Sequence, residues 1–402
     1  MRFIGNKEKL APKIYAILQE CAIIESSLRE STISNITEST PKGTTKSLGS
    51  KSLKPQQSFC DCFAGSASMG RFFKQKGFRI ISCDLLYFSY CLQRAYLQDN
   101  SLLDFVGLQG FLESFEKNPT AQCHISLVQS TLSLAQSPYD KVLAFLNSLQ
   151  GKEGFIATHY APSLSAKNGV ERKYFSDSNA AKIDSIRIQI EEWKDTKCIT
   201  EKEYYLLLAT LLESVSLFAN VAGVYAAFCK KWDSRAVKPF RLTGLSLDYP
   251  LQSSENLCFC GDSLQVLQTL ECNSQKLDIL YLDPPYNHRQ YAPNYHLLET
   301  IARYDNPNIK GVAGLRQWQE QKSRFCNVKS AYKELENFAK LKNYKNLVLS
   351  YNSEGLMQKE QIEEILKPIG NMCCVEIIYP RFKSNKNNGK KYIKEYVWVL
   401  QR

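Results

Sequence analysis

An apolar run that ends in two consecutive prolines is the feature that most constrains the fold. The run covers residues 277–282, and Asp283, Pro284, Pro285 and Tyr286 follow it. A short apolar run before a turn signal is typical of a buried strand. Proline fixes φ, lacks an N–H donor and disfavours helix in the residue before it. We therefore expect a buried strand with a stiff turn at its carboxyl end.

The turn after this strand offers acceptors and an aromatic ring. The Asp283 carboxylate and the Pro284 carbonyl accept hydrogen bonds, and Pro285 supplies no N–H. Tyr286 provides a ring on which a planar group can stack. Such a slot fits a flat ring with an NH2 group, which is what the methylation of an exocyclic amine requires. The alternative interpretation is a turn that merely ends a strand.

Composition indicates a large chain with its own core. At 402 residues, with 44% hydrophobic and 23% charged content, the chain can form one large domain or two. No segment approaches the ~18 apolar residues of a membrane span, and the first residues lack the apolar stretch of a secretory signal. We therefore expect a cytoplasmic protein. The 14 cysteines form no Cys-x-x-Cys pair and there are only four histidines, so we expect reduced cysteines and no metal site.

The charge balance suits a polyanionic partner. Lysine and arginine number 51 against 40 acidic residues, a net charge of +11. Basic residues crowd the stretch 381–394, which begins with Arg381 and Lys383. A turn signal at 387–389 also predicts a hairpin there, between strand-like runs at 375–382 and 392–400. Contact with a phosphate backbone and a solvated hairpin are both compatible with this pattern.

Strand-like and helix-like segments alternate along much of the chain. Strand-like runs at 58–63, 78–83, 257–260, 277–282 and 346–351 are followed or separated by helical patterns, among them 294–304, 328–342 and 358–368. Such alternation predicts a mainly parallel sheet with helices on both faces. Residues 26–58, rich in Ser, Thr and Lys and without an aromatic residue, are typical of a flexible insertion. Between about 90 and 255 the pattern is mostly helical, with a long apolar-rich helix expected over 204–230.

Three further strand ends carry carboxylates. Asp61 ends the first strand before a glycine-containing loop at 65–70, Asp84 ends the second, and Asp262 follows the strand at 257–260. In open α/β sheets, ligands bind outside the carboxyl ends of the strands. Asp84, 19 residues after Gly65, can hold the two hydroxyls of a ribose. Simple turns and strand-end carboxylates remain the alternative for each position taken alone.

Ala67 narrows the choice of cofactor. It replaces the middle glycine that a dinucleotide loop needs for close approach to a pyrophosphate. S-adenosylmethionine has a ribose and an adenine but no pyrophosphate, so an alanine obstructs it less. Asp61 can accept from the cofactor's ammonium group and Asp262 from its adenine amino group.

In their order along the chain, these motifs resemble those of the Dam-like adenine-specific DNA methyltransferases, most closely the FokI-type methylases of type IIS restriction-modification systems. The resemblance rests on the runs 2–7, 61–66, 261–263, 283–291 and 294–300, with shorter matches at 171–175 and 179–187. It implies an α/β, Rossmann-like methyltransferase fold whose mixed sheet is mainly parallel and ends in an antiparallel hairpin. It also implies five parts: an N-terminal cofactor-contacting segment 1–25, the insertion 26–58, a first catalytic part 59–90, a helical target-recognition domain 91–255, and a second catalytic part 256–402.

The resemblance implies roles for individual residues. Catalysis falls to Asp283, Pro284, Pro285 and Tyr286. S-adenosylmethionine is bound by Lys7, Asp61, Phe63, Gly65, Asp84, Asp262 and Ser263. DNA is contacted by Asn287, Arg289, Tyr291, Arg381 and Lys383. Ala67 and Ser263 depart from the family pattern, in which glycine and an aromatic residue are more usual. The implied substrate is an adenine flipped out of double-stranded DNA, and a separate restriction endonuclease is a possible partner; we expect a monomer without membrane association.

Four other functions remain open at this point. The same cofactor and tetrapeptide would serve an adenine methyltransferase acting on RNA, or an enzyme acting on the exocyclic amine of cytosine, although serine is more common there in place of the first aspartate. A catalytically silent nucleic-acid-binding module is opposed by the intact Asp283, Tyr286, Asp61 and Asp84. An NAD(P)-dependent dehydrogenase is opposed by Ala67.

Overall fold

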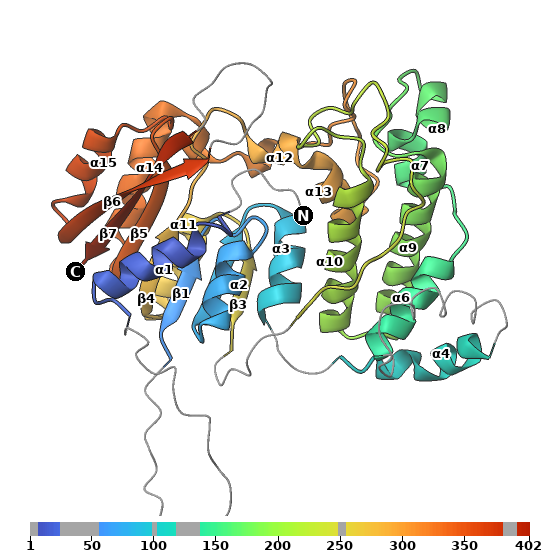
Figure 1. The fold of residues 1–402 in the computed structure, drawn as a ribbon, viewed down its shortest axis with the longest axis horizontal. Coiled ribbons are helices and arrows are strands. Elements are labelled where there is room, and N and C mark those ends of the chain that lie inside the picture. Colours follow the sequence, from blue (N-terminus) through green and yellow to red (C-terminus); the bar gives the residue numbers. More distant parts are fainter. Residues whose placement is uncertain (1–6, 25–55, 99–102, 118–136, 248–254, 381–391) are drawn as a thin grey trace, which may run out of the picture.

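The computed structural model describes residues 7–24, 56–98, 103–117, 137–247, 255–380 and 392–402. Figure 1 shows a sheet covered by helices beside a block made of helices alone. Among the described residues, no helix is both long enough and apolar enough to cross a membrane.

A seven-stranded sheet forms the centre of the first part. Its strands are β1 Ser58–Asp61, β2 Arg79–Asp84, β3 Leu257–Cys260, β4 Leu277–Leu282, β5 Tyr344–Asn352, β6 Asn371–Pro380 and β7 Tyr392–Gln401, in the spatial order β3-β2-β1-β4-β5-β7-β6. The pairs from β3 to β5 are parallel, whereas β7 is antiparallel to both β5 and β6. The four carboxyl ends of β1 to β4 therefore lie at one edge.

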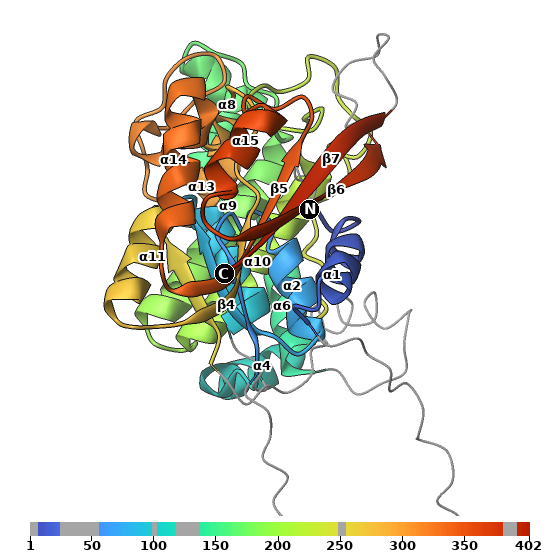
Figure 2. The same ribbon diagram turned by 90° about the vertical axis from the view of Figure 1, so that its left-hand side faces the viewer.

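Helices cover both faces of the sheet (Figures 1 and 2). One face carries α1 Ala11–Glu20, α2 Ser68–Gln75 and α3 Tyr87–Gln93; the other carries α11 Ser263–Cys272, α14 Val328–Lys340 and α15 Lys359–Leu366. Along β4, Ile279 and Tyr281 pack into the first core, and Leu280 and Leu282 into the second. The four residues from Ile279 to Leu282 are all apolar or aromatic because both faces of the strand are buried there, whereas Asp278, near the start of the strand, is only partly buried and accepts from Ser58.

The helical block continues the first core instead of forming one of its own. It contains α4 Gln109–Glu116, α6 Pro138–Ser148, α7 Phe155–Tyr160, α8 Pro162–Lys167, α9 Asp177–Asp195 and α10 Glu201–Phe218. Its long apolar side chains lie in the same buried cluster as α1 and α2. The buried Arg187 of α9 donates to the carbonyls of Ile301 (3.0 Å) and Ala302 (3.1 Å) in α13 His296–Arg303. The block is therefore fastened to the segment that follows the double proline.

One expected helix is shorter than the sequence indicated. The prediction of helix over 204–230 was wrong at its carboxyl end, because α10 ends at Phe218 and residues 219–247 form only turns and irregular structure. The side chain of Asn220 donates to the carbonyls of Lys173 and Cys229, both at 2.9 Å. These tertiary hydrogen bonds replace the helical ones that the apolar spacing favoured.

The predicted fold class is confirmed: a mainly parallel mixed sheet with a C-terminal antiparallel hairpin and a large helical block. Strands and helices lie within a few residues of their expected positions. The proposed flexible insertion 26–58 falls mostly on residues 25–55, which lie outside the described part of the chain. The five domain boundaries stay predictions.

Candidate active site

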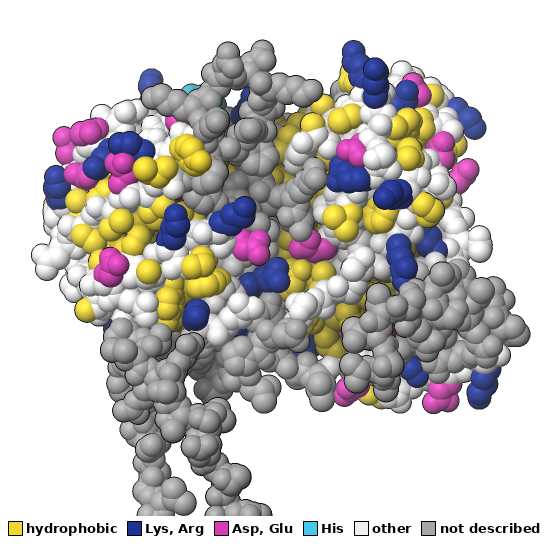
Figure 3. Space-filling view, in the orientation of Figure 1, with side chains coloured by type: hydrophobic (Ala, Val, Ile, Leu, Met, Phe, Trp, Pro, Cys, Tyr) yellow, Lys and Arg dark blue, Asp and Glu magenta, His cyan; other side chains and the backbone are white. Residues whose placement is uncertain are grey.

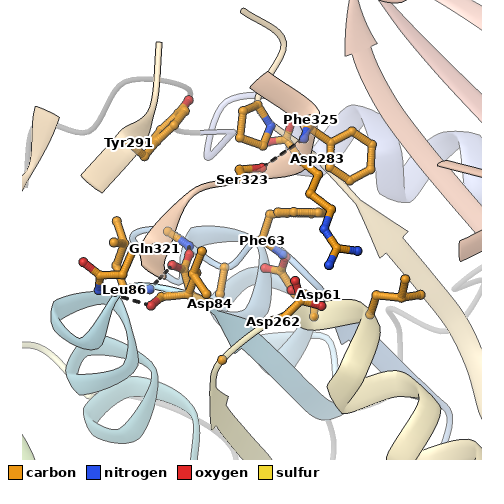
Figure 4. A pocket seen from close by; sticks show the side chains of 18 of the residues that line it. Asp61, Phe63, Asp84, Leu86, Asp262, Asp283, Tyr291, Gln321, Ser323 and Phe325 are labelled. Carbon is orange, nitrogen blue, oxygen red and sulfur yellow. Dashed lines mark hydrogen bonds between the residues drawn. The ribbon is translucent and has the colours of Figure 1, made fainter. Parts of the chain in front are cut away.

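Four strand ends meet at one pocket. Asp61 ends β1, Asp84 ends β2, Asp262 follows β3 and Asp283 follows β4, and all four line the same cavity (Figure 4). Parallel neighbours in the sheet bring these ends together, as the spacing predicted.

The loop after β1 is tied to the end of β2. Gly65 has a φ of 52°, in the left-handed region that favours glycine, and its N–H donates to the Asp84 carboxylate at 2.8 Å. Leu86 N–H donates to the other carboxylate oxygen at 2.9 Å. Burial raises the pKa of Asp84, and these two hydrogen bonds oppose the rise. Each oxygen keeps acceptor capacity for a further donor, as the predicted ribose contact needs.

Asp61 is buried with spare acceptor capacity. Its carboxylate is 1% exposed, and Oδ1 accepts from Phe63 N–H at 3.3 Å. Oδ2 has no hydrogen-bond partner among the described residues. Burial raises the pKa of Asp61 to about 8, and the negative charges of Asp283 and Asp84 add to the effect. A cation placed against Oδ2 would offset both the cost of burial and the repulsion from the neighbouring carboxylates. The position therefore suits an ammonium group.

Asp262 and Ser263 begin α11 and also face the pocket. Asp262 caps the helix, with Oδ1 accepting from Gln265 N–H at 3.1 Å. The Ser263 hydroxyl donates to the Cys62 carbonyl, so its proton is used inside the protein. Asp262 thus holds a structural role and still lines the pocket, whereas Ser263 contributes mainly to its shape.

Aromatic rings form the wall beside Asp262. Phe63 meets Phe325 edge to face, with ring centroids 5.5 Å apart, and Phe338 lies within 6.1 Å of both. All three line the pocket with Leu264. A flat heterocycle fits such a wall, because aromatic faces and edges attract one another at these distances.

Asp283 lies against a buried ion pair. Lys7 Nζ is 3.3 Å from the Asp283 carboxylate and also binds Glu395 of β7. Ser350 Oγ donates to Glu395 at 2.7 Å. Burial opposes the charge on Lys7, but the two carboxylates outweigh it and raise the pKa of the lysine. Burial raises the pKa of Asp283 to about 7, with Lys7 lowering it and Glu395 raising it.

The other three residues of the tetrapeptide differ in whether they face the cavity. Pro284 is buried, Pro285 lines the pocket, and the half-buried Tyr286 packs edge to face on Tyr351 at 6.5 Å. The Tyr286 carbonyl accepts from Leu356 N–H at 3.0 Å, which fixes the turn. Tyr286 is not among the residues that line the cavity, so its predicted stacking role has no cavity contact in support.

The predicted DNA contacts divide into three groups. Tyr291 opens the short helix α12 Tyr291–Asn294 and lines the pocket. Asn287 accepts from Arg289 N–H at 2.9 Å, and the Arg289 side chain is exposed outside the cavity. Arg381 and Lys383 lie outside the described residues.

Sequence reasoning missed several residues of this site, among them Glu395, Ser350, Phe325 and Phe338. The spacing along β7 gave a weak signal for Glu395. It is two and four residues before Val397 and Val399, so it lies on the same face of the strand as these buried valines. A charge at an inward position of a strand indicates a buried partner. That the partner is Lys7, 388 residues away, depends on the fold.

Comparison with known proteins defines the class that this fold and site represent. Residues 31–365 match the family of D12 class N6 adenine-specific DNA methyltransferases. The chain is 36% identical over 348 residues to the type II methyltransferase M.NlaIII of Neisseria lactamica, covering 86% of this chain and 90% of that protein. No solved structure matches the chain.

Two other relatives are longer proteins. The type II methyltransferase M.FokI of Planomicrobium okeanokoites is 34% identical over 349 residues, and the modification methylase StsI of Streptococcus sanguinis is 33% identical over 353 residues. Each match covers 86% of this chain and 48% of the relative. The chain belongs to the D12 class of N6 adenine-specific DNA methyltransferases, as its motifs predicted, and is thus an enzyme.

Proposed function

We propose that this protein transfers the methyl group of S-adenosylmethionine to the exocyclic N6 amino group of an adenine flipped out of double-stranded DNA. The observation that carries the proposal is the meeting of two carboxylates in one pocket: the buried Asp61, with an oxygen that has no partner among the described residues, and the largely buried Asp283, held by Lys7. The first suits the ammonium of the cofactor and the second suits the amino group of the substrate.

The pocket residues fit the three parts of S-adenosylmethionine. Asp61 would bind the ammonium beside Gly65 and Phe63, and Asp84 would bind the ribose. Asp262 would accept from the adenine amino group, against the wall of Phe63, Phe325 and Phe338. When bound, this cofactor supplies an electrophilic methyl group on a sulfonium. No metal is needed for that transfer, because the leaving thioether is neutral.

Asp283 and Pro284 would prepare the amino group. The adenine nitrogen is a weak nucleophile because its lone pair is delocalised into the ring. Hydrogen bonds from its two N–H groups to the Asp283 carboxylate and the Pro284 carbonyl favour the form in which the lone pair points at the methyl group. They also stabilise the positive charge that develops on nitrogen. Lys7 and Glu395 would hold Asp283 in place for this contact.

The target base must leave the duplex to reach this pocket, at a cost of a few kcal/mol. Pro285 and Tyr291 line the pocket near Asp283, and Tyr286 and Asn287 stand on the same turn. We assign stacking to Tyr286 and contacts with the displaced strands to Tyr291, Arg289, Arg381 and Lys383. The names of the relatives further support a role as the modification component of a restriction-modification system, with a separately encoded endonuclease.

Incubation of the protein with unmethylated double-stranded DNA and S-adenosylmethionine tests the proposal. Mass spectrometry of the digested nucleosides should show N6-methyladenine in DNA and no label in an RNA sample run in parallel. Label in RNA alone would favour an RNA methyltransferase with the same site. N4-methylcytosine, or no methylated base in either, would overturn the proposal.

A further inference from the structure

Residues 219–247, here called the connecting segment, combine irregular structure with strong positive charge. Five lysines or arginines stand in it against a single aspartate, Asp233. It contains no helix or strand, although it lies in a well-packed block. Long ordered stretches without regular structure are uncommon in compact domains and are often functional.

Three asparagines hold this segment in one conformation. Asn220, fully buried, donates to two carbonyls and accepts from Asp233 N–H at 3.0 Å. Asn179 of α9 donates to the carbonyls of residues 236 and 238 and accepts from Phe240 N–H at 2.9 Å. Asn147 of α6 accepts from Leu242 N–H at 2.8 Å. Each asparagine replaces a missing backbone partner, so the segment is fixed without regular structure.

The connecting segment is also attached to the wall of the active site. Tyr225 N–H donates to the carbonyl of Asn294 at 2.8 Å, at the end of α12. The Tyr225 carbonyl accepts from Tyr174 Oη at 2.8 Å and lies 2.9 Å from His296 Nε2. In Figure 1 the yellow-green trace after α10 runs beside α12 and α13. Since α12 carries Tyr291 into the pocket, a ligand on the segment would sit next to the target-base side.

The exposed side chains of the segment have the chemistry of a nucleic-acid surface. Lys230, Lys231, Lys238 and Arg241 are exposed. Asp233 is 3.2 Å from Arg235, so the one acid is already neutralised. Trp232 is 37% exposed between the lysines and Arg235. Figure 3 shows lysine and arginine side chains along the upper rim of the helical block.

We propose that residues 230–241 form the surface that holds the DNA duplex beside the flipped adenine and helps to choose the sequence. The lysines would neutralise phosphates, and Trp232 would contact bases or sugars. The inference rests on the proposed function, because it takes duplex DNA as the substrate. A rigid, preorganised surface serves this purpose, since little ordering is needed on binding.

The test compares two lysine pairs in the same block. Lys230→Ala/Lys231→Ala changes the proposed surface, and Lys194→Ala/Lys197→Ala changes exposed lysines at the far end of α9. That helix has 19 residues, which at 1.5 Å per residue separates its ends by about 27 Å. Sequencing of DNA methylated by the protein first maps its target site. Fluorescence anisotropy then measures binding to a labelled duplex that carries this site, with S-adenosylhomocysteine present. A scrambled duplex is measured in parallel, each at several salt concentrations.

We expect the Lys230/Lys231 pair to weaken binding of both duplexes about tenfold and to make the salt slope of log Kd shallower by about 1.8, near 0.9 for each lost phosphate contact. Trp232→Ala should reduce the preference for the mapped site about tenfold, in line with the loss of one stacking contact. Affinity for S-adenosylmethionine should not change, which shows that the variants are folded.

If the Lys230/Lys231 pair matches the Lys194/Lys197 control in affinity and salt slope, the surface does not contact DNA and the inference is overturned. Both lysines are exposed, so their substitution keeps the test valid even if Trp232→Ala fails to fold. The methylation assay with the unsubstituted protein distinguishes failure of the proposed function from failure of this inference. Absence of N6-methyladenine with the unsubstituted protein counts against the proposed function, whereas normal methylation with unaffected binding counts only against this surface.

Discussion

Two buried aspartates show how the pocket differs from the helical block. Asp184 in α9 is inaccessible to solvent and accepts from three backbone N–H groups of residues 154–157 and from the hydroxyl of Tyr304. Asp61 is 1% exposed; its Oδ1 accepts from Phe63 N–H, and its Oδ2 has no hydrogen-bond partner among the described residues. The two side chains have the same chemistry and nearly the same burial.

The difference separates a structural charge from a functional one. A buried carboxylate costs several kcal/mol unless donors surround it. Asp184 meets this condition within the fold, so it holds the start of α7 and the end of α13 together. Asp61 does not meet it, and the missing donor at its Oδ2 favours the binding of a cationic ligand in the pocket. Substitution of a buried carboxylate at the sheet edge should therefore affect activity, and substitution of a buried carboxylate in the block should affect stability.

The largest effect on activity is expected at Asp283. Asp283→Ala removes the acceptor for the amino group and should lower kcat at least about 1000-fold, near 4 kcal/mol of transition-state stabilisation. Lys7 and Glu395 remain paired, so the melting temperature and the affinity for S-adenosylmethionine should stay close to those of the unsubstituted protein. Radiolabelled methyl transfer under single-turnover conditions measures the change. Retained turnover would exclude the assigned role.

Asp184→Ala should show the opposite pattern. Four donors lose their acceptor inside the block, so the free energy of unfolding should fall by about 3 kcal/mol. Urea unfolding monitored by circular dichroism gives that value. The kcat per folded molecule, measured well below the melting temperature, should be unchanged. A normal stability together with a large loss of kcat would break the distinction between the two regions.

Asp61→Asn should act on cofactor binding alone. The amide keeps the shape but loses the charge, so the Kd for S-adenosylmethionine should rise about 30-fold, near 2 kcal/mol for a hydrogen bond to a charged group. Isothermal titration calorimetry measures it, with the exposed Asp195→Asn as the control. Removing an under-satisfied buried carboxylate should leave stability equal or higher. An unchanged Kd would mean that Asp61 does not meet the ammonium.

The smallest effect concerns pH. Burial holds the pKa of Asp283 at about 7. Only its ionised form carries the negative charge that stabilises the positive charge developing on the amino nitrogen, so kcat should rise with pH through about 7 and level above it. Glu395 raises that pKa through its negative charge, so Glu395→Gln should move the midpoint to lower pH. Ser350→Ala is the control, because it removes the hydrogen bond to Glu395 and leaves the charge. A midpoint that moves upward in Glu395→Gln would contradict the electrostatic assignment.

Much of the sheet edge could be predicted from the sequence, and the partners of its residues could not. Asp61, Asp84, Asp262 and Asp283 each follow an apolar run, and parallel strands place such ends side by side. The pairing of Lys7 with Glu395 joins the two ends of the chain, and no local pattern indicates it.

The connecting segment was missed for a related reason. Apolar residues continue beyond Phe218 at spacings compatible with a helix, so local periodicity favoured helix up to residue 230. The competing hydrogen bonds come from Asn220, Asn179 and Asn147, and two of these lie on other helices. Tertiary contacts outweigh propensity there, and they also produce the surface for which we propose DNA contact.

The most direct test of the central claim is a crystal structure with S-adenosylhomocysteine bound. The account predicts that its amino nitrogen lies within hydrogen-bonding distance of Asp61 Oδ2, with the ribose at Asp84 and the adenine between Asp262 and Phe325. A ligand bound elsewhere, or one that leaves Asp61 Oδ2 without a partner, would contradict the claim that the missing hydrogen-bond donor at Asp61 marks the cofactor site.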